Sequence, residues 1–157
     1  MRGLYYEEFE VGQVYKHALT RTVTEADNVL FTSLTMNVAP IHLDAEHARS
    51  TVHGQRLVNS LLTLALVNAY QVPELTMGTT LGNLGYEEVR FPNPVFHGDT
   101  LRGETRILDK RLSNSRDDSG IVWFGHVGYN QRDEVVCTCR RAGLMMRRPA
   151  EEQATHD

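Results

Sequence analysis

The segment from Met36 to Asp44 is the part of the chain most able to do chemistry, because it holds an amide and an imidazole five residues apart. Asn37 supplies the amide and His42 the imidazole, and Pro40 stiffens the backbone between them. An imidazole can take up and return a proton near neutral pH, whereas an amide does not titrate but can accept a hydrogen bond from water. The segment therefore predicts an acid/base residue, His42, beside a water-positioning residue, Asn37.

A second feature follows shortly after this segment. Residues 58–70 are apolar almost all the way round, which predicts a helix enclosed by other elements and stopped by Pro73. The first turn of a helix has free backbone N–H groups and a partial positive charge. The N–H of Ser60 is therefore a candidate for stabilising negative charge on a substrate oxygen. Together, His42 and Ser60 indicate acid/base chemistry beside an oxyanion site.

Each of these residues also has a structural interpretation. His42 could be a partly buried side chain bonded to backbone, as is usual for one histidine among seven. Asn37 could brace its loop, and Ser60 could be an ordinary first residue of a helix. His97 and Asp99 flank a glycine at a turn, where a structural role is favoured over a functional one.

The remaining pattern predicts the elements that position these residues. A strand is expected at 13–23, followed by a helix from Glu25 to Leu34 with Thr24 and Asp27 at its cap. That helix should bury Val29, Leu30 and Leu34, and Asp44 should cap a short helix through residues 45–48. Period-two alternation predicts four more strands, at about 79–91, 99–112, 120–130 and 134–147.

A sheet and one apolar helix bury each other best when the sheet wraps around the helix. The fold class is therefore α+β. At 157 residues the chain is long enough for one domain, expected at 1–148, with a polar, disordered tail at 149–157.

Composition excludes several classes of function. The net charge is -4 with 41% hydrophobic residues and no basic stripe, so we expect no nucleic-acid partner. No apolar run approaches the roughly 18 residues of a membrane span, and the acidic N-terminus is unlike a signal peptide. Cys137 and Cys139 are too few for a metal site; we expect free, buried thiols on opposite faces of a strand, and hence a reducing, cytoplasmic location.

Three stretches together resemble the MaoC-like, R-specific enoyl-CoA hydratases, which have the hot-dog fold. They are Met36-Asn37-Val38-Ala39-Pro40-Ile41-His42, the helix opening Asn59-Ser60, and Val89-Arg90-Phe91-Pro92-Asn93-Pro94-Val95 followed by Gly98-Asp99-Thr100-Leu101. The chain departs from the family at two places. Asn37 stands where the family usually has a catalytic Asp, and Asn59-Ser60 where the helix usually opens with His-Gly.

The resemblance implies an enoyl-CoA hydratase or 3-hydroxyacyl-CoA dehydratase acting on a short or branched acyl-CoA, with no cofactor beyond the coenzyme A of the substrate. Residues 57–66, the Asn83-Leu84-Gly85-Tyr86 segment and Cys137-Thr138-Cys139-Arg140-Arg141 resemble the branch that hydrates mesaconyl-CoA or itaconyl-CoA, which are five-carbon dicarboxylic thioesters. The resemblance to the MaoC-like family further implies a homodimer or a higher assembly of dimers. Substrate contacts are expected from Asn59 and from Arg56 or Arg90. Coenzyme A phosphates could be met by Arg140, Arg141, Arg147 and Arg148, although arginines at strand ends usually face solvent.

Two alternatives stay open from the sequence. Hot-dog proteins include acyl-CoA thioesterases, in which water attacks the thioester carbonyl instead of the double bond. A non-catalytic acyl-CoA-binding protein would also fit the substitutions at Asn37 and Asn59.

Overall fold

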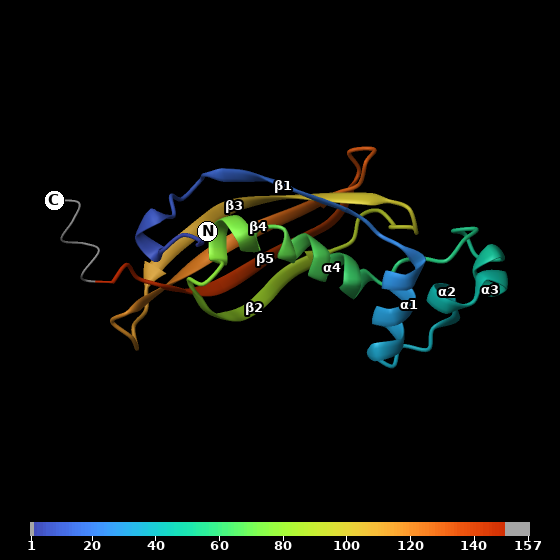
Figure 1. Cartoon of the computed structure of the whole chain (residues 1–157), viewed down its shortest axis with the longest axis horizontal. Helices are drawn as coiled ribbons and strands as arrows, with labels where there is room; N and C mark the ends of the chain where they lie inside the picture. The colour runs from blue at the N-terminus through green and yellow to red at the C-terminus, as the bar shows by residue number, and fades with distance from the viewer. Residues whose placement is uncertain (1, 150–157) are drawn as a thin grey trace.

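The computed structural model describes residues 2–149, which form one antiparallel sheet of five strands in the order β1-β3-β4-β5-β2 (Figure 1). The strands are β1 (Val14–Thr22), β2 (Thr80–Arg90), β3 (Thr100–Leu112), β4 (Ser119–Tyr129) and β5 (Val135–Met146). All five predicted strands are confirmed. The predicted tail, apart from Pro149, lies outside the described residues.

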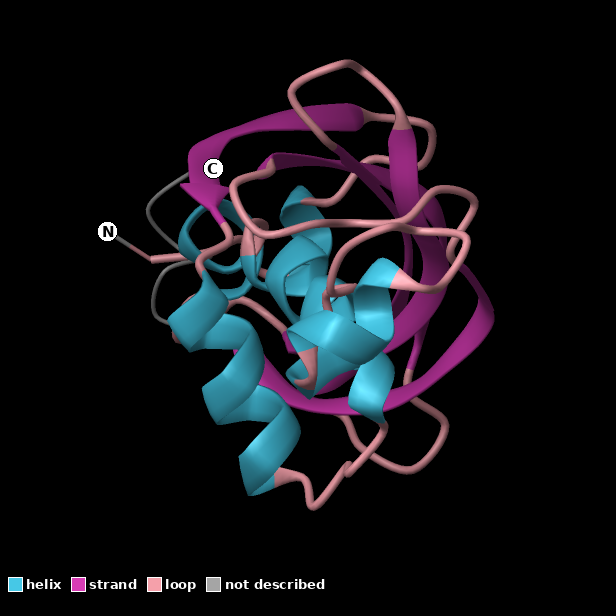
Figure 2. Ribbon diagram, turned by 90° about the vertical axis from the view of Figure 1, so that its right-hand side faces the viewer, coloured by secondary structure: helices cyan, strands magenta, loops and turns pink. Residues whose placement is uncertain are grey.

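The sheet curves around the helices (Figure 2). These are η1 (Tyr6–Glu8), α1 (Glu25–Leu34), α2 (Pro40–Leu43), α3 (Ala45–Arg49), α4 (Ser60–Ala69) and the π-helical turn η2 (Val72–Thr76). The hot-dog arrangement predicted from the sequence, a sheet wrapped around one apolar helix, is confirmed. None of the helices in the described part is long and apolar enough to span a membrane.

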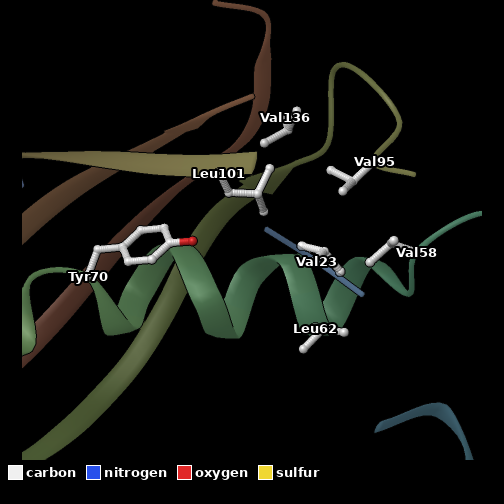
Figure 3. Packing of buried hydrophobic residues seen from close by; sticks show 7 residues of the cluster. All are labelled: Val23, Val58, Leu62, Tyr70, Val95, Leu101 and Val136. Carbon is white, nitrogen blue, oxygen red and sulfur yellow. The ribbon is translucent and has the colours of Figure 1, made fainter. Parts of the chain in front are cut away.

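Helix α4 contributes to a core that the sheet completes (Figure 3). The buried members of this core are Val23, Val58, Leu62, Tyr70, Val95, Leu101 and Val136. The helix is not enclosed on all sides, however, so that expectation was wrong. Leu61 is 58% exposed and Ala65 and Ala69 are also exposed, which leaves one apolar stripe uncovered at a spacing of four residues. The sheet of a single chain covers only part of the helix surface.

Helix α1 has the predicted bounds and the predicted cap, in which Thr24 accepts a hydrogen bond from the Asp27 N–H at 3.1 Å. The predicted buried face was wrong. Leu30 and Leu34 are 62% and 74% exposed, whereas Asn28 and Thr32 are fully buried. The helix turns a polar side inward because Asn28 makes hydrogen bonds there.

Two other local expectations need correction. Helix α4 ends at Ala69, and Pro73 lies in the first turn of η2, where a missing N–H costs little. Cys137 and Cys139 are free and buried as expected, but they lie on the same face of β5, because residues two apart in a strand share a face.

Candidate active site

The segment that carries His42 is held at the leading end of α4 by two hydrogen bonds with Leu57, one of them made by the imidazole. The Nδ1–H of His42 donates to the carbonyl oxygen of Leu57 at 2.7 Å, and the Leu57 N–H donates to the carbonyl of Ile41 at 3.0 Å. Because Nδ1 carries the proton, Nε2 is left with a lone pair that can accept one. Leu57 lies three residues before Ser60, so the imidazole is anchored beside the start of the helix.

Asn28 connects the segment that carries His42 to the start of α4, and reasoning from the sequence missed this residue. Its amide NH₂ lies 3.3 Å from the carbonyl of His42 and 3.2 Å from that of Leu57, while its Oδ1 accepts from the Asn59 N–H at 2.8 Å. Nε2 of His97 lies 3.0 Å from the same nitrogen, whose two hydrogens are shared among these three acceptors. No signal in the sequence pointed to Asn28, because the apolar pattern placed Leu30 and Leu34, and not Asn28, on the inward side of the helix.

Asn59 caps α4 and leaves the N–H of Ser60 open. The side chain of Asn59 is 3% exposed, and its Oδ1 accepts from the Leu61 N–H at 3.0 Å. Within the described part of the chain, the Ser60 N–H has no hydrogen-bond partner. The structure thus gives Asn59 a capping role, and its predicted contact with substrate stays a prediction.

Ser60 lines a pocket of about 310 Å³, mostly apolar, that a ligand could enter. Its lining includes Leu57, Val58, Thr63, Val95, Val136, His53 and the segment 91–94. His42 and Asn37 do not line it; His42 is connected to it through Leu57, whose carbonyl it binds. A ligand oxygen at the helix start would meet the N–H of Ser60 in largely apolar surroundings, where such a hydrogen bond is strongest.

Asn37 braces its own loop. Its Oδ1 accepts from the Ala39 N–H at 3.0 Å, closing an Asx turn just before Pro40. The preceding residue, Met36, has a φ of 55°, a left-handed conformation that ends α1 and turns the chain toward α2. The bracing interpretation of Asn37 is what the structure shows, and its water-positioning role stays a prediction.

No hydrogen bond joins either candidate arginine to His42 in the described part of the chain, although Arg56 directly precedes Leu57. Arg56 forms an ion pair with Glu25 and is partly buried, and Arg90 is exposed at the end of β2. Burial, reinforced by the positive charge of Arg56, lowers the pKa of His97. The roles of both arginines in substrate binding stay predictions.

The turn around Gly98 has the structural role that the sequence favoured. Asp99 is 5% exposed and accepts hydrogen bonds from the Phe96 N–H at 2.9 Å and from the Gln131 amide at 2.8 Å. Burial acts to raise the pKa of Asp99, but these hydrogen bonds outweigh it and lower the pKa. Asp99 therefore fixes the entry into β3 as a carboxylate.

Residues 8–122 match the family model of the MaoC like domain. The chain belongs to the MaoC-like family. Among curated relatives, the mesaconyl-CoA hydratase of Cereibacter sphaeroides is 32% identical over 93% of this chain, which covers 42% of that protein. The beta-methylmalyl-CoA dehydratase of Chloroflexus aurantiacus is 33% identical over 99% of this chain, which covers 45% of that protein. This MaoC-like chain thus spans less than half the length of these relatives.

Solved structures agree with this placement. A MaoC-like dehydratase from Rhodospirillum rubrum superposes with a TM-score of 0.80 at 32% identity, covering 94% of this chain and 99% of that one. A Mycobacterium tuberculosis protein described as having a double hot-dog fold superposes with a TM-score of 0.80 at 19% identity. The MaoC-like chain covers 46% of that protein, so it corresponds to one of two hot-dog units.

Proposed function

We propose that the chain is an enoyl-CoA hydratase, or in the reverse direction a 3-hydroxyacyl-CoA dehydratase, acting on a short or branched acyl-CoA. The observation that carries this proposal is the hydrogen bond from His42 Nδ1–H to Leu57, which presents a basic Nε2 beside the start of α4. The reaction needs no cofactor beyond the coenzyme A that the substrate itself carries.

In the proposed reaction His42 acts first as base and then as acid. Nε2 takes a proton from water as the water oxygen bonds to the β-carbon, and the electrons of the double bond move onto the thioester oxygen. The N–H of Ser60 stabilises that oxygen, a contribution of about 2.7–4 kcal/mol for one such donor. The imidazolium then returns a proton to the α-carbon, the thioester carbonyl re-forms, and His42 is restored for the next turnover.

For the acyl group we propose a five-carbon dicarboxylic chain of the mesaconyl or itaconyl type. Support comes from relatives named mesaconyl-CoA hydratase and beta-methylmalyl-CoA dehydratase, each matched over more than nine tenths of this chain. A relative named (R)-specific enoyl-CoA hydratase, 30% identical over 66% of this chain, supports the reaction type but not the second carboxylate.

We also propose that the working particle is a dimer joined through β2. This strand lies at the edge of the sheet and exposes Leu81, Leu84 and Val89, next to the uncovered stripe of α4. Unpaired edges and contiguous apolar surface favour association with another chain. The double hot-dog neighbour shows that two units of this fold occur together in one protein. The two free thiols favour a reducing compartment such as the cytoplasm.

The test is a hydration assay with crotonyl-CoA and mesaconyl-CoA, in which the reaction is monitored through the loss of the enoyl absorbance. We expect turnover with at least one of them and no release of free coenzyme A. Release of free thiol without loss of the double bond would instead identify a thioesterase, and binding without either reaction would identify a non-catalytic protein.

A further inference from the structure

A chain of hydrogen bonds crosses the core beneath the sheet and ends on a buried arginine. The Nε–H of Arg141 donates to His126 Nε2 at 3.3 Å, and His126 Nδ1–H then donates to the Thr105 hydroxyl at 2.9 Å. That hydroxyl is hydrogen-bonded to His17 Nε2 at 2.8 Å, and His17 Nδ1–H donates to the Glu74 carboxylate at 3.0 Å. Since Arg141 can only donate, its position fixes the direction of the two bonds made by His126.

The relay holds Arg141 rigidly but does not satisfy it. The guanidinium carbon lies 4.6 Å from the centre of the Phe124 ring, and the residue is only 6% exposed. Burial, reinforced by Arg141, lowers the pKa of His126 to about 3, so this partner is neutral. Among the described residues no carboxylate pairs with Arg141, and its Nη2 has no hydrogen-bond partner. A buried, unpaired guanidinium is costly and calls for an anion.

Arg141 lines an open pocket of about 320 Å³ between the end of α4 and the edge strand β2. Gln71, whose Oε1 is also buried without a partner, lines the same pocket, as do Asn68 and Tyr86. Asn68 donates to the Tyr86 hydroxyl, which frees the Tyr86 O–H to donate in turn. The pocket therefore offers an ionic donor and a hydroxyl donor, a pair suited to a carboxylate.

A short acyl chain cannot reach this pocket from the oxyanion site of its own subunit. Asn68 follows Ser60 by eight residues, so the two lie about 12 Å apart along the helix axis at about 1.5 Å per residue. The distal carboxylate of a five-carbon dicarboxylic thioester lies only about 5 Å from the thioester carbon, given carbon–carbon bonds of about 1.5 Å. The carboxylate would have to meet an Arg141 that belongs to another chain.

Pairing two copies through β2 supplies that geometry. A two-fold axis that pairs the two edge strands antiparallel also sets the two α4 helices antiparallel, because both elements belong to one rigid unit. Where the uncovered stripes of the two helices also face each other, the end of one helix lies beside the start of the other. Ala69, in the uncovered stripe, lines the Arg141 pocket, so the pocket opens on the face that this pairing covers.

We propose that Arg141, assisted by Tyr86 of the same subunit, binds the distal carboxylate of a short dicarboxylic acyl-CoA. The thioester of that substrate lies at Ser60 of the other subunit, and its reacting carbons face His42 of that other subunit. The site rests on the proposed hydratase function and on the dimer. In it the relay from Glu74 to Arg141 positions the guanidinium, and selectivity for a dicarboxylic substrate comes from the second chain.

The first experiment compares kcat/KM for mesaconyl-CoA and for crotonyl-CoA, which lacks the distal carboxylate. Arg141→Gln should lower the value for mesaconyl-CoA about 10- to 100-fold, the usual loss for a hydrogen bond to a charged group, and leave crotonyl-CoA within about threefold. Arg141→Lys, which keeps the charge, should retain part of the preference. The matched control is Arg140→Gln on the outer face of the same strand, where Arg140 pairs with Glu88.

The second experiment tests whether the arginine acts across the dimer. His42→Ala and Arg141→Gln chains are co-expressed with two different tags and purified through both, so that each particle contains one of each. One of its two sites then combines His42 from one chain with Arg141 from the other. Turnover of mesaconyl-CoA should rise to about half that of the wild type, well above either variant alone.

Several results would overturn the proposal while leaving the hydratase function in place. These are an equal loss on both substrates in Arg141→Gln and Arg141→Lys, no gain in the mixed particle, or a wild type that hydrates crotonyl-CoA but not mesaconyl-CoA. The first would mean that Arg141 only supports the fold, with water as its partner in the pocket. Failure to hydrate either thioester would instead remove the proposed function itself.

Discussion

The two ends of α4 carry polar sites of opposite design. At its start, the acid/base candidate is held through backbone carbonyls and the amide of Asn28, and the group left open is a lone pair on His42. At its end, a relay of side chains holds Arg141, and the group left open is a cationic N–H. One end is arranged to accept a proton and the other to accept an anion. The same apolar helix thus separates the chemistry from the recognition.

The largest expected effect lies at the start of the helix. His42→Ala should lower kcat about 10²- to 10⁴-fold, the usual contribution of a general acid/base, with a smaller change in KM. His47→Ala, an exposed histidine on α3, is the matched control and should leave kcat unchanged. Equal turnover in both variants would move the acid/base role away from His42.

The end of the helix should dominate the acid sensitivity of the fold. Folded His126 has a pKa of about 3, below that of an unfolded histidine, so the unfolded chain binds more protons between pH 6.5 and 3. Its contribution to stability is complete above about pH 6.5 and is lost as the pH falls through this window, by on the order of 3–5 kcal/mol.

Urea denaturation at a series of pH values measures this loss. His126→Gln should flatten the slope of the free energy of unfolding against pH between about pH 6.5 and 4.5. Carboxyl groups with lowered pKa values do not yet titrate in this range. His97→Gln, at the other end of α4, should flatten it less, since the pKa of His97 is lowered from a less buried position. The reverse order would mean that the His126 relay is open to solvent.

The Asn28 bridge should couple stability to activity at the start of the helix. Asn28→Ala leaves the buried Asn59 N–H without its acceptor, so the free energy of unfolding should fall by about 1–3 kcal/mol. It should also lower kcat, because the Leu57 carbonyl that orients His42 loses a donor. Asn114→Ala, at an exposed position, should change neither quantity. Full activity in Asn28→Ala would show that the loop holds His42 unaided.

The smallest effect is expected at Asn37. Asn37→Ala removes the Asx turn to Ala39 and any contact with the attacking water, and should lower kcat by less than about tenfold. Steady-state kinetics against His42→Ala measures the difference. A loss as large as that of His42→Ala would give Asn37 an essential part in the chemistry.

Local rules predicted the elements of this molecule well because their causes lie a few residues apart. The Thr24 cap, the bounds of α1 and the five strands follow from capping chemistry and alternation along the chain. The wrapping of the sheet around α4 also followed, since a sheet and one apolar helix have few ways to bury each other, whereas the order of the strands was not predicted.

What the sequence did not reveal depends on distant partners. Asn28 looked like a polar residue in a helix until the fold brought Leu57 and Asn59 to it. Arg141 looked like a strand-end arginine facing solvent, yet it alternates inward and stacks on Phe124. The open stripe at Leu61 could not be foreseen either, because a uniformly apolar helix carries no mark of the side that its own sheet leaves bare.

The most direct test of His42 as the acid/base is a single-turnover hydration of an enoyl-CoA in D₂O, with the product analysed by mass spectrometry. We expect the wild type to place one deuterium on the α-carbon, and His42→Ala to form no product on the same timescale while His47→Ala matches the wild type. Deuterated product formed by His42→Ala at the wild-type rate would contradict the assignment of this histidine.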